Sequence, residues 1–163
     1  MFIELEPVFN NEGESVNFDY GFDIPGSLPG AGQRADTVTV RGNASNGNGA
    51  VLLDASAEFD HFYKCDCCNE NVKKRVSLPV RHCLLQSSAD EEHGDIYITV
   101  ENTRLDLDEL VTEDILLNLP SKLLCKEGCK GLCFICGANL NSGSCSCEKA
   151  VDPRFEKLKQ LLN

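Results

Sequence analysis

Hydrophobic and polar positions alternate along several segments between residues 37 and 100, with the two-residue period of half-buried β-strands. The alternation runs over 37–42 and resumes over 50–63, and the residues from Asn46 to Gly49 between them favour a tight turn. These two segments are therefore predicted to pair as an antiparallel hairpin.

Further segments extend this sheet. Residues 72–80 and 96–100 are rich in β-favouring side chains, and the apolar residues within 1–9 are compatible with an opening strand. Residues 10–36 are polar and rich in Gly, Pro and Asn, which predicts a long mobile loop. Together these segments predict an antiparallel β-meander of four or five strands, forming a partly closed sheet.

An amphipathic helix is predicted over about 106–119. Asp106 or Asp108 is a suitable N-cap, Asp106 has Glu109 three residues later, and Pro120 ends the helix. One side of the helix carries the row Leu107, Val111, Ile115 and Leu119, flanked by Leu110 and Leu117. This side is expected to cover the sheet. Asp114 and Asn118 fall in the same arc and need hydrogen-bond partners if they are buried.

These elements predict an α+β fold in two parts. Residues 1–120 would form the acidic, β-rich part with its covering helix. Residues 121–163 would form a zinc-bound, cysteine-rich segment with a short terminal helix, for which Asp152 and Pro153 are suitable first residues. Residues 1–119 carry 8 basic and 22 acidic side chains, whereas 120–163 carry 7 and 4. The cysteine-rich end is thus the basic end of a chain whose net charge is −11.

Neither a signal peptide nor a membrane span is recognisable. The first residues lack a basic region followed by an apolar run, and no stretch reaches the roughly 18 to 20 apolar residues of a membrane helix. We therefore expect a cytoplasmic protein that does not engage membranes. In a reducing compartment, ten cysteines in 163 residues indicate metal binding or redox chemistry rather than disulfide bonds.

Four of the cysteines near the C-terminus form a self-contained metal-binding pattern. Cys133 and Cys136 are separated by two residues, as are ligand pairs that hold one zinc ion from a tight turn. Gly137 suits the left-handed position of such a turn. Cys145 and Cys147 follow after a run of turn-forming residues. These four sulfurs predict a tetrahedral zinc site.

Four other cysteines have ligand-like spacing, but neither pair closes a site alone. Cys65 and Cys68 lie at the predicted tip of a hairpin, and Cys125 and Cys129 precede the four-sulfur pattern. A second zinc shared between these pairs would give two zinc ions per chain and join the sheet to the C-terminal segment. The competing interpretation assigns one zinc to the six C-terminal cysteines and leaves the first pair free.

The remaining two cysteines are expected not to be ligands. Cys67 is then a spare thiol and Cys83 a small core residue. Spacing alone does not exclude an iron–sulfur cluster, although neither common ferredoxin pattern is present. The cysteine pairs also suit a redox-responsive protein that releases zinc and forms disulfides on oxidation.

Catalytic machinery is not recognisable. The three histidines, His61, His82 and His93, are scattered, and neither a paired carboxylate nor a Gly-rich phosphate loop occurs in a recognisable context. His82 and Cys83 are adjacent in a predicted strand, so they should point to opposite faces. All-cysteine zinc sites are usually closed and structural. We therefore expect a protein that is not an enzyme and takes no small-molecule substrate.

Several of these segments together resemble a known family. The residues over 114–120, the run LCKEGCKGLCFICGANLN, the closing cysteine pair and residues 151–155 are similar to the YceD-like proteins, the large-ribosomal-RNA accumulation proteins of bacteria and plastids. The likeness begins near residue 50 and is most specific over 114–162. It implies a non-enzymatic role in large-subunit ribosomal RNA accumulation, and hence in ribosome biogenesis. The family usually has arginine where this chain has Cys67, which leaves open whether Cys67 replaces that arginine or acts as an alternative ligand.

A shared zinc would gather basic residues from the hairpin and from the C-terminal segment. These residues are Lys64, Lys73, Lys74, Arg75, Lys122, Lys126 and Lys130. Such a patch could contact ribosomal RNA phosphates, although the thiolates add negative charge and no aromatic stacking platform is recognisable. Contact with ribosomal assembly proteins fits equally well, and the lysines could also simply balance the thiolates.

Overall fold

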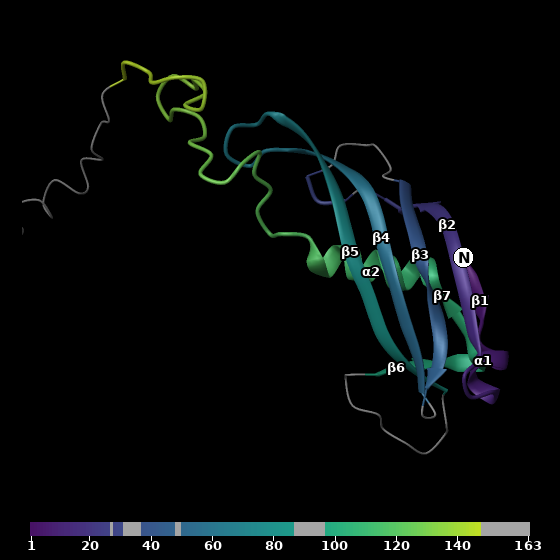
Figure 1. Ribbon diagram of the computed structural model, residues 1–163. Helices are drawn as coiled ribbons and strands as arrows, with labels where there is room; N and C mark the ends of the chain where they lie inside the picture. Colours follow the sequence, from purple (N-terminus) through teal and green to yellow (C-terminus); the bar gives the residue numbers. More distant parts are fainter. Residues whose placement is uncertain (27, 31–36, 48–49, 87–96, 148–163) are drawn as a thin grey trace, which may run out of the picture.

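The computed structural model describes residues 1–26, 28–30, 37–47, 50–86 and 97–147. A five-stranded sheet has the strand order β2-β3-β4-β5-β6, and a two-stranded sheet pairs β1 with β7. Helix α2 crosses one face of the larger sheet (Figure 1). The elements are β1 (Phe2–Glu4), α1 (Glu6–Asn10), β2 (Ser15–Asp23), β3 (Thr37–Gly47), β4 (Ala50–Lys64), β5 (Asn71–Gln86), β6 (Tyr97–Val100), the short 3₁₀ helix η1 (Glu101–Thr103), β7 (Arg104–Asp106) and α2 (Leu107–Asn118).

The long strands β3, β4 and β5 pair antiparallel, which confirms the predicted hairpin between β3 and β4. Alternation decides which side chains face α2, because successive strand residues point to opposite faces. In β4 the buried positions are Val51, Leu53, Ala55, Ala57, Phe59, His61 and Tyr63. We call this covered side of the sheet the inner face.

Helix α2 packs on the inner face as its pattern predicts. Its buried residues are Leu107, Leu110, Val111 and Ile115. The Asp106 side chain caps the helix by accepting a hydrogen bond from the backbone N–H of Asp108 at 3.1 Å. Asp114 meets the ring of His82 on β5, with Oδ2 and Nε2 2.8 Å apart. The predicted α+β fold with a helix-covered sheet is therefore confirmed.

The prediction of a mobile loop over 10–36 is wrong for its central part. Strand β2 pairs with β3 along its whole length, from Ser15 opposite Ser45 to Asp23 opposite Thr37. Phe18 is buried and its apolar neighbours alternate with polar residues, but the intervening Asn, Asp and Gly hid this strand signal. Tertiary pairing overrides the weak local preference.

The meander is not antiparallel throughout. Strand β6 runs parallel to the end of β5, with Cys83 opposite Tyr97 and Gln86 opposite Val100. A two-residue turn would impose antiparallel pairing, whereas the ten residues between these strands leave both directions open. The predicted opening strand is also shorter than expected, because α1 begins at Glu6 with Pro7 in its first turn. The predicted terminal helix lies outside the described residues.

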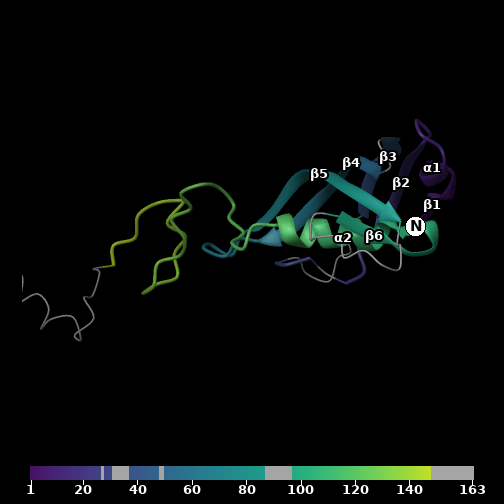
Figure 2. The same ribbon diagram turned by 90° about the horizontal axis from the view of Figure 1, so that it is seen from below.

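After α2 the chain leaves the sheet and passes the tip of the β4–β5 hairpin, then extends beyond it as the cysteine-rich segment (Figure 2). Between residues 119 and 147 one isolated β-bridge, Leu132 with Asn139, is the only strand-like pairing. No helix in the described part of the chain is long and apolar enough to cross a membrane.

Candidate metal centres

The connection between β4 and β5 turns two sulfurs toward one point. The backbone N–H of Cys65 donates to the Glu70 carbonyl at 2.9 Å, and that of Asn69 donates to the Cys65 carbonyl at 2.8 Å. Asn69 has a φ of 59°, a left-handed conformation that asparagine tolerates better than most residues. This tight turn leaves Cys65 and Cys68 buried.

The segment after α2 is fastened to this hairpin by polar contacts. The backbone of Asp66 donates to the Leu123 carbonyl at 2.8 Å, and the Leu123 N–H donates to Asp66 Oδ2 at 2.6 Å. The Tyr63 hydroxyl donates to the Leu124 carbonyl at 2.9 Å. Leu123 itself is buried. These contacts place Cys125 beside the hairpin tip.

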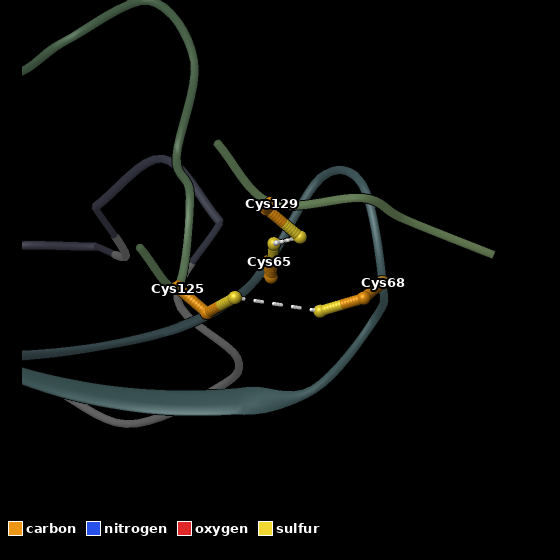
Figure 3. A group of neighbouring side chains, drawn as sticks. All are labelled: Cys65, Cys68, Cys125 and Cys129. Carbon is orange, nitrogen blue, oxygen red and sulfur yellow. Dashed lines mark hydrogen bonds between the residues drawn. The ribbon is translucent and has the colours of Figure 1, made fainter. Parts of the chain in front are cut away.

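Four sulfurs meet between the hairpin and the C-terminal segment (Figure 3). The Sγ atoms of Cys65 and Cys129 are 3.8 Å apart, and those of Cys68 and Cys125 are 3.6 Å apart. A disulfide would need about 2.05 Å. Tetrahedral zinc with bonds of about 2.3 Å places its sulfurs about 3.8 Å from one another. These two distances are therefore compatible with a tetrahedral zinc ion, and all four sulfurs lie within 4.8 Å of one another. We call these four cysteines the shared group.

The electrostatics of the shared group also favour a cation. Burial by itself raises the pKa of the Cys65 thiol, but backbone N–H groups of Cys68, Cys125 and Cys67 outweigh it and hold that pKa at about 6. The Cys65 sulfur is thus readily ionised. Ionising further sulfurs at this distance is disfavoured, because thiolates repel one another. A metal ion between the sulfurs would stabilise all four charges.

The second four-sulfur group, which we call the local group, consists of Cys133, Cys136, Cys145 and Cys147, whose sulfurs all lie within 4.8 Å of one another. Gly137 has a φ of 71°, as its place in the turn predicts. The Cys133 N–H donates to the Ala138 carbonyl at 2.8 Å, and the Gly137 N–H donates to the Cys133 carbonyl at 2.9 Å. Backbone N–H groups of Cys136 and Ile135 lower the pKa of Cys133 to about 6. This knuckle is therefore prepared for a metal ion.

Side chains between the two halves of the local group reach the shared group. Asn141 donates from Nδ2 to Cys129 Sγ at 3.2 Å, and it accepts from the Lys130 N–H at 3.0 Å. Asn139 donates to Glu70 on the hairpin at 2.7 Å. Sequence reasoning missed these contacts, because asparagine in such a run is indistinguishable from an ordinary turn residue.

The described cysteines divide as the two-site prediction requires. The six C-terminal cysteines do not form one group, since Cys125 and Cys129 lie with the hairpin pair. Cys67 belongs to neither group, and its carbonyl accepts the Leu132 N–H at 3.1 Å. Cys83 is half-exposed rather than a core residue, because His82 takes the inward position of that strand. That the two groups hold zinc stays a prediction.

The basic residues of the prediction come partly together. Five of the seven line a cavity of about 850 Å³ between β5 and the segment after α2, next to Cys125. They are Lys73, Lys74, Arg75, Lys122 and Lys126. Lys64 and Lys130 line two smaller hollows elsewhere.

Strand register separates the cations of β5. Lys73 and Arg75 stand opposite Phe62 and Asp60 on the outer face, and both form ion pairs there, Lys73 with Asp60 at 2.9 Å and Arg75 with Glu58 at 2.8 Å. Lys74 stands opposite His61 and therefore points to the inner face. Lys74, Lys122 and Lys126 have no ion pair with another residue that the structure describes.

The histidines do not form a catalytic constellation in the described residues. His61 is buried in β4 beside Tyr63, with ring centroids 5.1 Å apart. His82 is held by Asp114, while Cys83 points to the other face. His93 lies outside the described residues.

Comparison with known proteins gives these groups a context. A family model described as large ribosomal RNA subunit accumulation protein YceD matches residues 53–162, which include both cysteine groups. The chain belongs to the YceD family. The resemblance noted in the sequence is therefore confirmed, and the family description names a role in large ribosomal RNA accumulation and no catalytic activity.

Relatives of this YceD family member are distant. Uncharacterized proteins of Mycobacterium bovis and Mycobacterium tuberculosis are 30% identical over 116 residues, which cover 69% of this chain and 56% of theirs. The chain thus spans just over half the length of these curated relatives. The chloroplastic large ribosomal RNA subunit accumulation protein YCED homolog 1 of Zea mays is 31% identical over 68 residues, covering 40% of this chain and 23% of its own. No solved structure matches.

Proposed function

We propose that this protein is a non-enzymatic zinc-binding factor in large-subunit ribosomal RNA accumulation, and that it acts by contacting RNA or ribosomal assembly proteins. Its family supports the biological role. Two zinc ions per chain would fix the C-terminal segment against the hairpin, because the shared group takes two sulfurs from each. We expect the protein in the compartment where ribosomes assemble, here the cytoplasm.

The cavity beside the shared group is the observation that favours RNA over assembly proteins. Five basic residues and one acidic residue, Glu127, line it, although the chain as a whole carries a net charge of −11. The C-terminal end of α2 adds a partial negative charge at one wall, and the ammonium groups of Lys74, Lys122 and Lys126, which have no ion pair among the described residues, outweigh it. Phosphates are the natural partners of such a concave basic site.

Ion pairing and position relative to the cavity rank the seven proposed contact residues. Lys73 and Arg75 already have carboxylate partners, so an RNA phosphate would have to displace Asp60 or Glu58 to reach them. Lys74, Lys122 and Lys126 require no such exchange. Lys64 and Lys130 lie outside the cavity and would contact only the flanks of a bound strand. The acidic remainder of the chain would limit non-specific adhesion to RNA.

A charge-matched pair of variants tests this proposal. Replacing Lys74, Lys122 and Lys126 together by Ala should weaken binding to a large-subunit ribosomal RNA fragment and lower the slope of log K against log salt by about 2. The control removes three cations that do not line the cavity, Arg41, Arg81 and Arg104. If both triple variants lose the same affinity, net charge explains the effect and the cavity does not.

The biological role needs a separate measurement in cells. Loss of the protein should lower mature large-subunit ribosomal RNA relative to small-subunit ribosomal RNA, and the unaltered chain should restore the ratio. The variant that lacks Lys74, Lys122 and Lys126 should restore the ratio less well than its charge-matched control. If wild-type protein binds no RNA while the cellular ratio still depends on it, assembly proteins are the partners instead.

A further inference from the structure

The tip of the zinc knuckle presents an apolar surface that the sequence did not reveal. The side chain of Phe134 is 106% exposed, and its neighbours Ile135 and Leu132 are 59% and 37% exposed. Phe134 occupies the first position between the two sulfurs of the knuckle. We call these three residues the knuckle tip.

The knuckle tip is held outward by its own backbone. The Ile135 N–H donates to Cys133 Sγ at 3.4 Å, and the turn closes where the Gly137 N–H donates to the Cys133 carbonyl at 2.9 Å. A metal ion in the local group would lock the same turn. Phe134 therefore cannot fold back onto the sheet without breaking the knuckle.

Two other rings of the described chain, those of Phe2 and Phe62, are covered in a way that Phe134 is not. The ring of Phe2 lies under the Arg104 guanidinium, 4.2 Å from its centroid, and Phe62 lies under the Lys73 ammonium at 5.2 Å. No ring or cation contact of this kind involves Phe134 among the residues that the structure describes. Both faces of its ring are thus available to a flat partner.

Cations on the same segment favour a nucleobase as that partner. Phe134 lies on residues 120–147, where Lys122, Lys126 and Lys130 offset the carboxylate of Glu127 and the negative charge of a zinc-bound local group. Proteins that bind single-stranded RNA combine cations for the backbone with aromatic side chains on which bases stack. We propose that Phe134 stacks on an unpaired base of ribosomal RNA whose backbone the cavity lysines hold, an inference that rests on the proposed function.

A substitution series separates stacking from apolar docking. Phe134→Ala should weaken binding to a single-stranded ribosomal RNA fragment by roughly 5- to 100-fold, the usual range for one stacked base. Phe134→Tyr should restore binding and Phe134→Leu should not, because a base stacks on a π-face. Ile135→Ala serves as the neighbouring control and should have little effect. Zinc content equal to wild type shows that each variant keeps its knuckle.

Fluorescence gives a direct readout, because the chain contains no tryptophan. In Phe134→Trp the single indole should emit as a solvent-exposed one, and single-stranded RNA should quench it through stacking. Retained RNA affinity in Phe134→Leu would overturn the inference, because binding would then not need a π-face. Buried indole emission without RNA would overturn it in favour of residues 148–163 or a second copy. Wild-type protein that binds no RNA at all would instead contradict the RNA contact of the proposed function.

Discussion

Asn141 joins the two cysteine groups through a single side chain. Its amide donates to the sulfur of Cys129 at 3.2 Å, yet the residue lies in the loop that closes the local group. A hydrogen bond to a thiolate stabilises the charged form that binds metal. Folding of the local group therefore supplies a donor to the shared group, which would make the metal affinities of the two groups interdependent.

Replacing Asn141 by Ala should make the shared group release zinc more readily. Partners of metal ligands typically contribute 10- to 100-fold in affinity, so we expect a loss in that range with two zinc ions still bound at saturation. Competition with a chromophoric chelator measures it. Ser142→Ala is the control, because the recorded contact of Ser142 is made by its backbone N–H, which donates to the Asn139 carbonyl at 3.2 Å. Equal zinc affinities in the two variants would exclude the coupling.

Strands β3 and β4 depend on a close approach at Gly42. This glycine stands opposite Ala55, and a Cβ added to it would lie 2.4 Å from the Ala55 Cβ and 2.5 Å from the Asp54 carbonyl oxygen. Backbone and methyl atoms cannot move aside as a flexible side chain would. The central strand pair therefore tolerates no larger residue at this position without displacement.

Gly42→Ala should lower the free energy of unfolding by about 1 to 3 kcal/mol through this overpacking. Urea denaturation of the zinc-loaded protein measures the change. Gly47→Ala, in the same strand but with open space around the added Cβ, should change stability far less. Comparable losses in the two variants would show that the close contact with β4 does not set the cost.

The shared group would act as a metal clasp between the acidic sheet and the basic C-terminal segment. The shared group takes its first pair from the β4–β5 hairpin and its second pair from the segment after α2, about 57 residues further on. One ion there would determine where the cavity lysines stand relative to β5. The local group shapes its own knuckle instead, and with it the knuckle tip.

Metal stoichiometry tests this organisation directly. The purified chain should contain two zinc ions, and replacing Cys65 and Cys68 together by Ser should reduce this to one. Cys67→Ser is the matched control in the same turn and should retain both ions, because Cys67 belongs to neither group. A constant count after the double replacement would rule out the shared site, and a loss with Cys67→Ser would make that residue a ligand.

Local sequence patterns correctly predicted the features that depend on interactions between neighbouring residues. The antiparallel pairing of β3 with β4 and the helix capped by Asp106 follow from neighbouring residues, and both occur as predicted. The division of eight cysteines into two groups of four could also be anticipated, because each pair comes from one tight turn.

Long-range pairing escaped prediction. Strand β2 is stable because it pairs with β3 along its whole length. Strand β6 runs parallel to β5, across a connection whose length permits either direction. The position of Cys83 depended on which residues of β5 face α2. His82, which contacts Asp114 on α2, is on that face, so Cys83 is on the other.

By itself, the sequence determined the family, the ligand-like sulfur pairs, the covering helix and the hairpin, because each is encoded in adjacent residues. Only the tertiary structure decided that five basic residues line one cavity, and that two of them, Lys73 and Arg75, are paired with carboxylates on the outer face. It likewise decided that Asn141 reaches Cys129 and that Phe134 stands exposed. Each of these depends on strand register or on loop contacts between distant segments, and a one-residue shift would alter them.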